Sequence, residues 1–484
     1  MKLSHVSPLW VELILLQFLN SLIPKFKINK MNKIFWMFVG LVQVLLLVLA
    51  LGFPALADDE PDEAVLEHRK GLALARENRH LQAIESFTRA MEMRPDFIQA
   101  LNNRGLSYME LTRFQEAELD FIKALEIDPR YFQAWNNVAL ARYKMEQYPQ
   151  ALQDAQKALS INPAFGMPHV TQGLIYMETD QYSKALEAFD RVVKMDPSYA
   201  RGFYHRGLAN LELDRLQPAR HDLDKALSMD KNNTFFLFAR ARIHLASNRT
   251  AEAMEDVNRI LDLKSGSFDA LGLRARVHLA EKDYPHALGD LNLALELNQE
   301  DPSLFALRGD TRARLGDLAE AVMDYSKSLD LNPVQSNVFN HRGIALTGLG
   351  SYGPALADYN RSIELDPDNA QAYLNRASVH FYQGQISQAL ADLDKSISLR
   401  PESEVAYNNR GCILLELEEY EQAIEDFAKA LELDSGYIEA RSNFGLALVL
   451  SGNIRQGCSE LSQACENGWC NNLDWAVEQN KCPK

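Results

Sequence analysis

One feature limits the possible folds of this chain more than any other: its residues repeat with a period of 34. Starting at Gly71, a small residue recurs at this step through twelve repeats. The positions are Gly71, Gly105, Ala139, Gly173, Gly207, Ala241, Ala275, Gly309, Gly343, Ala377, Gly411 and Gly445. A second small-residue column lies twelve positions later, from Ala83 to Gly457, and a third column holds Pro in seven repeats. An unbroken register of this kind indicates a repeat architecture.

Each repeat contains two amphipathic helical patterns with apolar spacing near 3.6 residues. The two small columns allow the paired helices to approach closely, and bulky residues such as Phe87 and Phe121 fill the remaining space. Proline ends the second helix, since it cannot continue a helix and disfavours one just before itself. The chain is therefore predicted to be all-α.

The pattern resembles the tetratricopeptide repeat family, for example in Asn103-Arg104-Gly105 with Phe121 and in Asn409-Arg410-Gly411 with Phe427. The resemblance covers residues 64–471. It implies an α-solenoid, a right-handed superhelix of about twelve helix-turn-helix repeats whose first helices line a concave inner surface. We number the predicted repeats 1 to 12: 64–97, 98–131, 132–165, 166–199, 200–233, 234–267, 268–301, 302–335, 336–369, 370–403, 404–437 and 438–471, followed by a Cys-containing cap at 472–484.

The N-terminal region carries a targeting signal. Ile34 to Phe53 form an uncharged apolar run, preceded by Lys33 and followed by Ala55-Leu56-Ala57 and acidic residues. This order is typical of a secretory signal peptide, and the run is also long enough for a membrane anchor. We predict that 1–57 is a signal peptide or an N-terminal anchor, that 58–63 is a linker, and that the repeats lie outside the cytoplasm, periplasmic or secreted. An alternative start at Met31 would make 1–30 a start-site artefact.

The charge of the chain limits its partners. The formal net charge is −16, and the first 57 residues contribute five Lys against one Glu, so the repeats are more acidic still. Nucleic acid is not expected as a partner, because phosphate binding needs a basic surface. Contact with a membrane is expected only through the apolar N-terminal segment.

The residue before the first small column is Arg in eight repeats, and each of these has Asp sixteen residues later. The pairs are Arg104 and Asp120, Arg206 and Asp222, Arg240 and Asp256, Arg274 and Asp290, Arg308 and Asp324, Arg342 and Asp358, Arg376 and Asp392, and Arg410 and Asp426. The arginines could form a cationic stripe for acidic ligands or bond to the aspartates internally. Pairing within the repeat fits all eight, whereas pairing with the preceding repeat fits six. We therefore predict structural ion pairs between the two helices of one hairpin.

One position earlier, five repeats carry Asn, namely Asn103, Asn137, Asn375, Asn409 and Asn443. In the family this position lies on the inner face, and it resembles the asparagine ladder of the O-linked N-acetylglucosamine transferase repeats, where side-chain amides hold an extended peptide. An amide offers a donor and an acceptor to any peptide backbone. These residues are peptide-binding candidates, and the alternative is that Asn is merely tolerated on a wet surface. In repeats 4 to 9, from Thr171 to His341, the same position holds residues other than Asn. This gap argues against one continuous groove.

The chaperone-type carboxylate clamp of the family is not expected. It would need Lys and Arg in the repeat after an inner Asn, but Gln133 and Asn137 stand there after Asn103, and Glu439 and Asn443 after Asn409.

Four cysteines lie close to the C-terminus, and an exported chain would use them as two disulfides. Cys458 and Cys465 are seven residues apart on one predicted helix, a rise of about 10 Å that is too long for a bond. A capping helix over 472–479 that folds back would bring Cys465 to Cys470 and Cys458 to Cys482, and we predict these two bonds. Their spacing matches no common zinc site.

Catalytic motifs are missing from the sequence: there is no phosphate-binding glycine loop, no His-Glu-x-x-His and no Gly-x-Ser-x-Gly. We expect neither an enzyme nor a cofactor or metal. Two functions stay open. The first is an extracytoplasmic scaffold that binds extended segments of other proteins in its concave face. The second is a structural or assembly component of an envelope complex, acting through outer faces or self-association.

Overall fold

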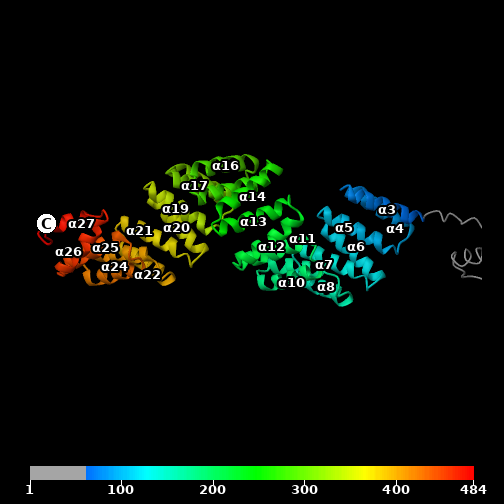
Figure 1. Cartoon of the computed structure of the whole chain (residues 1–484), viewed down its shortest axis with the longest axis horizontal. Helices are drawn as coiled ribbons and strands as arrows, with labels where there is room; N and C mark the ends of the chain where they lie inside the picture. The colour runs from blue at the N-terminus through cyan, green and yellow to red at the C-terminus, as the bar shows by residue number, and fades with distance from the viewer. Residues whose placement is uncertain (1–61, 484) are drawn as a thin grey trace, which may run out of the picture. The chain divides into compact units, whose positions relative to one another are not determined.

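The computed structural model describes residues 62–483, which contain 25 α-helices and no strand (Figure 1). The predicted all-α class is therefore confirmed. The chain divides into two compact units at Thr171 and Gln172. The predicted signal peptide or anchor at 1–57 lies outside the described residues. Among residues 62–483, no helix has the length and apolar character needed to cross a membrane.

The first unit contains three helical hairpins. Its helices are α3 (Glu63–Arg76), α4 (His80–Met93), α5 (Ile98–Glu110), α6 (Phe114–Ile127), α7 (Phe132–Lys144), α8 (Tyr148–Ile161) and the first residues of α9 (Met167–Glu178).

The second unit contains the rest of α9 and all later helices. These are α10 (Tyr182–Met195), α11 (Ala200–Glu212), α12 (Leu216–Met229), α13 (Thr234–Ala246), α14 (Thr250–Leu263), α15 (Phe268–Ala280), α16 (Tyr284–Leu297), α17 (Pro302–Leu315), α18 (Leu318–Leu331), α19 (Ser336–Gly348), α20 (Tyr352–Leu365), α21 (Ala370–Tyr382), α22 (Ile386–Leu399), α23 (Glu404–Glu416), α24 (Tyr420–Leu433), α25 (Ile438–Leu450), α26 (Ile454–Glu466) and α27 (Asn471–Glu478).

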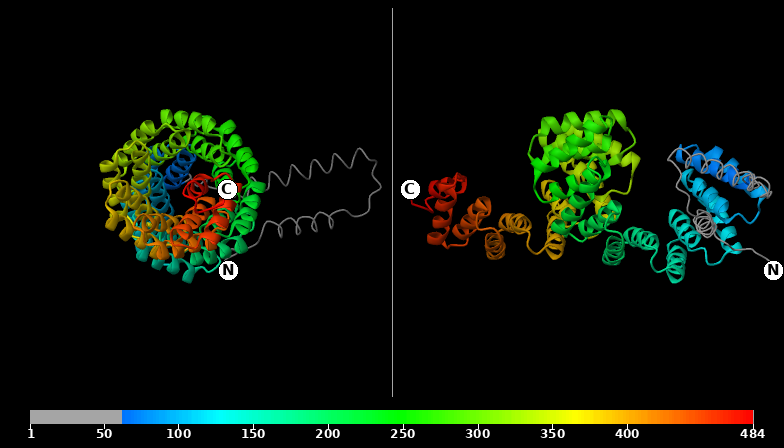
Figure 2. Two further views of the ribbon diagram at one scale, coloured as in Figure 1. Left: turned by 90° about the vertical axis from the view of Figure 1, so that its left-hand side faces the viewer. Right: turned by 45° about the vertical axis from the view of Figure 1, so that its right-hand side comes forward.

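Within each unit the hairpins stack side by side, as Figure 2 shows for the second unit. Each odd-numbered helix up to α25 is the first helix of its repeat, and the even-numbered helix after it is the second. Most first helices contact the first helix of the next repeat, as α5 does with α7 and α21 with α23. Among the described helices, no two second helices make a comparable contact. The first helices therefore line the inner side of each stack.

A first helix presents two different faces because of its 3.6-residue turn. Its fourth, eighth and eleventh residues face the second helix; Gly105, the eighth residue of α5, lies against the ring of Phe121 in α6. The second, sixth, ninth and thirteenth residues point the opposite way. We call these four the inner positions.

The first small column is matched in size to its partner on the second helix. A Cβ atom at Gly105 would lie 2.5 Å from the Phe121 ring, and one at Gly343 would lie 2.6 Å from the Tyr359 ring. Where the column holds Ala, the partner sixteen residues later is smaller, as in Ala139 with Ala155, Ala241 with Val257, Ala275 with Leu291 and Ala377 with Leu393. Gly is therefore required where an aromatic ring fills the gap between the helices.

The turn inside each hairpin holds one residue in the left-handed backbone region at the same position of every repeat. Glycine occupies it in four repeats, at Gly316, Gly350, Gly384 and Gly452. In the other eight the residue is Asn78, Thr112, Glu146, Asp180, Asp214, Asn248, Lys282 or Glu418. This column is not visible in the sequence, because most of its members are not glycine.

Candidate protein-binding surface

All eight predicted Arg–Asp pairs form within their own repeats. In each, the arginine Nε and Nη2 donate to the two oxygens of one carboxylate at 2.6–3.0 Å. The aspartates are buried, for example Asp222 at 2% exposure. Hydrogen bonding to its aspartate raises the pKa of most of these guanidinium groups, as Asp256 does for Arg240. The fixed two-point geometry makes the pairs structural and leaves no free cationic stripe.

The same arginines also join successive repeats, a role that the sequence analysis did not predict. In each of the eight, the remaining Nη1 donates to a polar side chain on the second helix of the preceding repeat, sixteen residues earlier. The acceptors are Thr88, Asp190, Asp224, Asn258, Asn292, Ser326, Asn360 and Asp394. Each arginine therefore links three helices: its own, the second helix of its repeat and the second helix of the preceding repeat. A polar residue two positions after the Asp column was the signal that could have revealed this contact.

Two repeats without the Arg–Asp pair fill the same place differently. Asp154 has Val138 in the arginine column, and Arg142 of the same helix donates to it at 2.8 Å instead. In repeat 12, Arg441 donates to Glu460 at 2.8 Å. An arginine therefore still bonds to the acidic residue of the second helix in these two repeats, although the arginine column itself holds another residue type.

The five asparagines of the inner face lie at the sixth position of their helices and are all half-buried. Four of them bond to the preceding repeat. The Nδ2 of Asn137, Asn375 and Asn443 donates to Asn102, Asn340 and Asn408 at 2.7, 3.0 and 3.1 Å. Asn103 bonds to His68 at 2.9 Å. The asparagines therefore support contacts between repeats as well as facing the inner side.

The acceptors form a second asparagine column, one residue earlier, that the sequence analysis overlooked. Asn102, Asn136, Asn340 and Asn408 are only 1–6% exposed. Asn102, Asn340 and Asn408 accept the Nδ2 of the Asn amide in the next repeat and so orient it. Asn136 instead accepts from the Thr171 hydroxyl at 3.2 Å. Consecutive Asn-Asn residues in repeats 2, 3 and 11 were the available signal.

Asn409 differs from the other four. Its side chain makes no hydrogen bond within residues 62–483, although it is half-buried between Asn375 and Asn443 of the neighbouring first helices. Its donor and acceptor are therefore both available to an incoming group. The three asparagines of α21, α23 and α25 come from successive repeats, and we call them the asparagine face.

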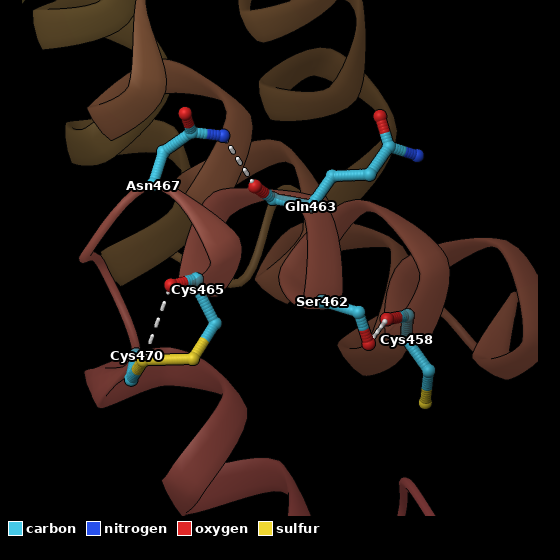
Figure 3. The surroundings of a disulfide bond; sticks show 6 residues. All are labelled: Cys458, Ser462, Gln463, Cys465, Asn467 and Cys470. Atoms are coloured by element: carbon cyan, nitrogen blue, oxygen red, sulfur yellow. Dashed lines mark hydrogen bonds between the residues drawn. A yellow bond between two sulfur atoms is a disulfide. The ribbon is translucent and has the colours of Figure 1, made fainter.

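The C-terminal cysteines form the two predicted disulfides. Cys458 bonds to Cys482 with 5.5 Å between Cα atoms, and Cys465 bonds to Cys470 with 4.2 Å. Figure 3 shows the second bond joining the end of α26 to the start of α27, beside Asn467, whose Nδ2 caps the Gln463 carbonyl at 2.9 Å. The short helix α27 packs on α25 and α26 and covers the last repeat. Cys412 is a free thiol at an inner position of α23, and burial raises its pKa to about 12.

The described part of the chain contains no group of three or more His, Cys, Asp or Glu side chains arranged to hold a metal ion. The buried aspartates between the paired helices are instead bound by arginine, as described above.

Comparison with known proteins identifies the repeat. The family described as "Tetratricopeptide repeat" matches residues 68–97, 98–131, 132–165, 170–234, 238–304, 302–335, 370–403 and 405–437, and the family described as "TPR repeat" matches 345–384. No curated protein matches the chain.

Several solved structures are similar. The Cut9–Hcn1 hetero-tetramer of the APC/C has a TM-score of 0.49 and 14% identity, covering 83% of this chain and 86% of that chain. Yeast Tom70 has a TM-score of 0.41 and 18% identity over 81% of this chain and 96% of that chain. A tetratricopeptide repeat protein from Parabacteroides merdae has a TM-score of 0.41 and 19% identity over 51% and 98%. On the family matches and the helical hairpins together, the chain belongs to the tetratricopeptide repeat family.

Proposed function

We propose that the protein is a non-catalytic interaction scaffold outside the cytoplasm, and that it binds extended segments of partner proteins on the inner side of its repeats. The observation that carries this proposal is the asparagine face of α21, α23 and α25. An extended segment running across these helices would meet one amide per repeat. The Asn409 amide can bond to a peptide N–H and C=O without regard to the side chains of the peptide. The Oδ1 atoms of Asn375 and Asn443 accept from Gln371 at 3.0 Å and from Asn472 at 3.5 Å, and a peptide N–H would replace these donors.

The contacts of Asn375 and Asn443 support this arrangement. Their Nδ2 atoms are held by the buried asparagines Asn340 and Asn408. Holding one end of an amide fixes its orientation before a ligand arrives, which lowers the entropy lost on binding. Asn409 between them has no internal partner among the described residues.

The location outside the cytoplasm is part of the proposal. Two observations support it: the sequence pattern at Ile34 to Ala57, and the two disulfides at the C-terminal cap. Disulfides persist in oxidising compartments and are rare in the cytosol.

The experiment is affinity capture from crosslinked native cells. It compares the wild type with Asn409→Ala alone and with the triple variant Asn375→Ala, Asn409→Ala, Asn443→Ala, after circular dichroism has shown equal helicity. The matched control is Gln388→Ala, Gln422→Ala, Gln456→Ala, which removes three exposed amides from the second helices of the same repeats. Discrete partners that are lost with the Asn variants and retained with the Gln variant support the proposal. Partners that are captured equally by the wild type, the Asn variants and the Gln variant contradict the proposal.

A second candidate function rests on apolar side chains of the outer, second helices. Leu81, Leu119 and Met323 are 62%, 58% and 62% exposed, which is unusual for large apolar residues. A structural component that packs through its outer faces would use such residues. In that case Leu119→Ser or Met323→Ser would remove partners that the Asn variants retain.

A further inference from the structure

The inner side of the second unit contains a region with different chemistry, on α11, α13 and α15. Its inner positions include Arg201 and Phe235, each second in its helix, and Arg242 and Arg276, each ninth in its helix. We call these four residues the arginine face. They are distinct from the Arg–Asp column, whose members in these helices are Arg206, Arg240 and Arg274.

The three arginines of this face are exposed and unpaired. Arg201, Arg242 and Arg276 make neither an ion pair nor a hydrogen bond within residues 62–483. Arg242 and Arg276 occupy the same position of neighbouring first helices, so their side chains project from adjacent points of the same surface. The column arginines next to them are each fully engaged with buried aspartates. Three uncommitted guanidinium groups on an acidic protein form a local surface of opposite charge to the rest.

Aromatic groups lie between these charges. Phe235 is 72% exposed, the highest value among the large apolar side chains. Tyr204 and His205 of α11 have ring centroids 5.1 Å apart, and Tyr204 also packs against Phe236 at 5.1 Å. Arg201 lies three residues before Tyr204 on α11, and Arg242 lies on the neighbouring first helix α13. Burial keeps His205 neutral, with its pKa lowered to about 4.

Two acidic residues, Glu212 and Asp269, share the inner positions of these helices. Glu212 ends α11 and Asp269 stands in the first turn of α15, two helical turns from Arg276. Neither forms an ion pair with the arginines. They therefore flank the arginine face rather than neutralise it.

We propose that the arginine face binds an acidic segment of a partner protein, with carboxylates on Arg201, Arg242 and Arg276 and one aromatic or aliphatic side chain on Phe235. Guanidinium groups recognise carboxylates through two parallel N–H bonds, and an exposed ring next to them covers apolar surface at the same time. This inference rests on the proposed function, since it names the partner chemistry for a second stretch of the inner side.

The test uses the full chain and a fluorescent twelve-residue peptide of Glu and Asp with one central Phe. Binding is followed by fluorescence anisotropy at low salt. Comparison peptides replace the acidic residues by Gln or by Lys. The variant Arg242→Gln, Arg276→Gln is expected to weaken binding of the acidic peptide about tenfold, and Phe235→Ser about threefold, by analogy with the loss of exposed ion pairs and apolar contacts. Binding should weaken as salt is raised.

The matched control is Arg191→Gln, Arg455→Gln, which removes the same charge from exposed arginines of the second helices α10 and α26. Its affinity should equal that of the wild type. Equal losses in the control and the Arg242, Arg276 variant would show an effect of net charge only and overturn the proposal. Equal binding of the Gln and acidic peptides would also overturn it. A difference in sedimentation coefficient between the wild type and the Arg242→Gln, Arg276→Gln variant would overturn it as well, because the arginine face would then bind a second copy of the chain.

The asparagine variants separate this inference from the proposed function. The triple variant of Asn375, Asn409 and Asn443 should bind the acidic peptide normally, since those residues lie on other helices. If that variant captures the same cellular partners as the wild type, the asparagine proposal fails and the arginine face still stands. If the acidic peptide does not bind while Asn-dependent partners are captured, only the arginine face fails.

Discussion

Repeats 5–7 and repeats 10–12 share one backbone plan but present different inner surfaces. In repeats 5–7, helices α11, α13 and α15 carry exposed arginines and Phe235 around a half-buried histidine, His205. In repeats 10–12, helices α21, α23 and α25 carry neutral amides, two of them held by the preceding repeat. The exposed inner positions, such as those of Arg201, Phe235 and Arg242, lie outside the packing between helices, so their residues can change without cost to the hairpin. The sixth position is different, because Ala239 and Leu273 are buried there. A repeat fold can therefore hold several ligand chemistries along one chain.

The largest expected difference between the two regions concerns the buried aspartates. Arg410→Met leaves Asp426 buried without its cation and should cost about 3–5 kcal/mol. Arg240→Met removes the same bond from Asp256, but His244 Nε2 lies 3.9 Å from that carboxylate and remains beside it. In repeat 11 the corresponding residue is Leu414, which offers no polar atom. Arg240→Met should therefore cost less than Arg410→Met.

Hydrogen exchange of the amides in α13, α14, α23 and α24 measures each cost locally, which is needed because long repeat arrays do not unfold in a single step. The double variant Arg410→Met, Asp426→Leu removes both charges and should recover most of the loss. A cost below about 1 kcal/mol for Arg410→Met would show that the pair is not a structural element.

The second difference is the pH dependence of repeats 5–7. Burial lowers the pKa of His205 from 6.5 to about 4, and the charge of Arg201 adds to this. The folded state thus disfavours a proton that the unfolded state accepts. Stability is complete above pH 6.5 and falls as the pH decreases toward 4, by at most about 3 kcal/mol. Repeat 11 has Asn409 at this position and lacks the effect. Protection factors in α11, which are exchange rates corrected for the intrinsic rate at each pH, should be lower at pH 4.5 than at pH 7. His205→Asn should abolish that loss of protection, and an unchanged protection profile would contradict the assignment.

The third difference lies in the contact between the paired helices. Gly411→Ala would place a Cβ atom 2.7 Å from the buried Phe427 ring and should cost about 1–3 kcal/mol. Phe427→Leu in the same chain should relieve the clash, because repeat 7 already combines Ala275 with Leu291. Gly289→Ala, in α16 with open space around it, serves as the control and should stabilise its helix by about 0.5–1 kcal/mol. Hydrogen exchange in α15, α16, α23 and α24 compares all three variants locally; equal protection of Gly411→Ala and the wild type in α23 and α24 would refute the size matching.

The smallest expected effect is in the hairpin turn. Lys282 in repeat 7 has a φ of 61°, where repeat 10 has Gly384 at 71°. Lys282→Gly should stabilise repeat 7 by about 0.5–1 kcal/mol, since a left-handed lysine costs about 1–2 kcal/mol and glycine loses part of that gain to chain entropy. Asn248→Gly at the same position of repeat 6 should change little, because Asn tolerates this conformation. Hydrogen exchange in the helices of repeats 6 and 7 tests this ordering, and an equal gain in protection for both variants would contradict it.

Contacts inside one repeat could be predicted from the sequence. The Arg–Asp pairs, the small columns and the helical hairpins all join residues at a fixed short spacing, so the periodicity repeats the same contact many times and makes it visible. The disulfides followed from helix geometry at the C-terminal cap, where a rise of about 1.5 Å per residue excludes the wrong pair. The matching of Gly with an aromatic ring sixteen residues later was partly visible in the sequence, because it also lies within one repeat at a fixed spacing.

Contacts between repeats were decided only by the tertiary structure. The third hydrogen bond of each arginine, the use of the Asn amides by the preceding repeat and the position of Asn409 without an internal partner all depend on how neighbouring hairpins pack. The separation of Arg201, Arg242 and Arg276 from the paired arginine column also depends on which face of each helix meets its neighbour. The sequence by itself therefore determined the fold and the bonds within each hairpin. Which polar groups are consumed by packing, and which stay available for a partner, was determined by the stacking, because a side-chain donor is free only when no neighbouring group reaches it.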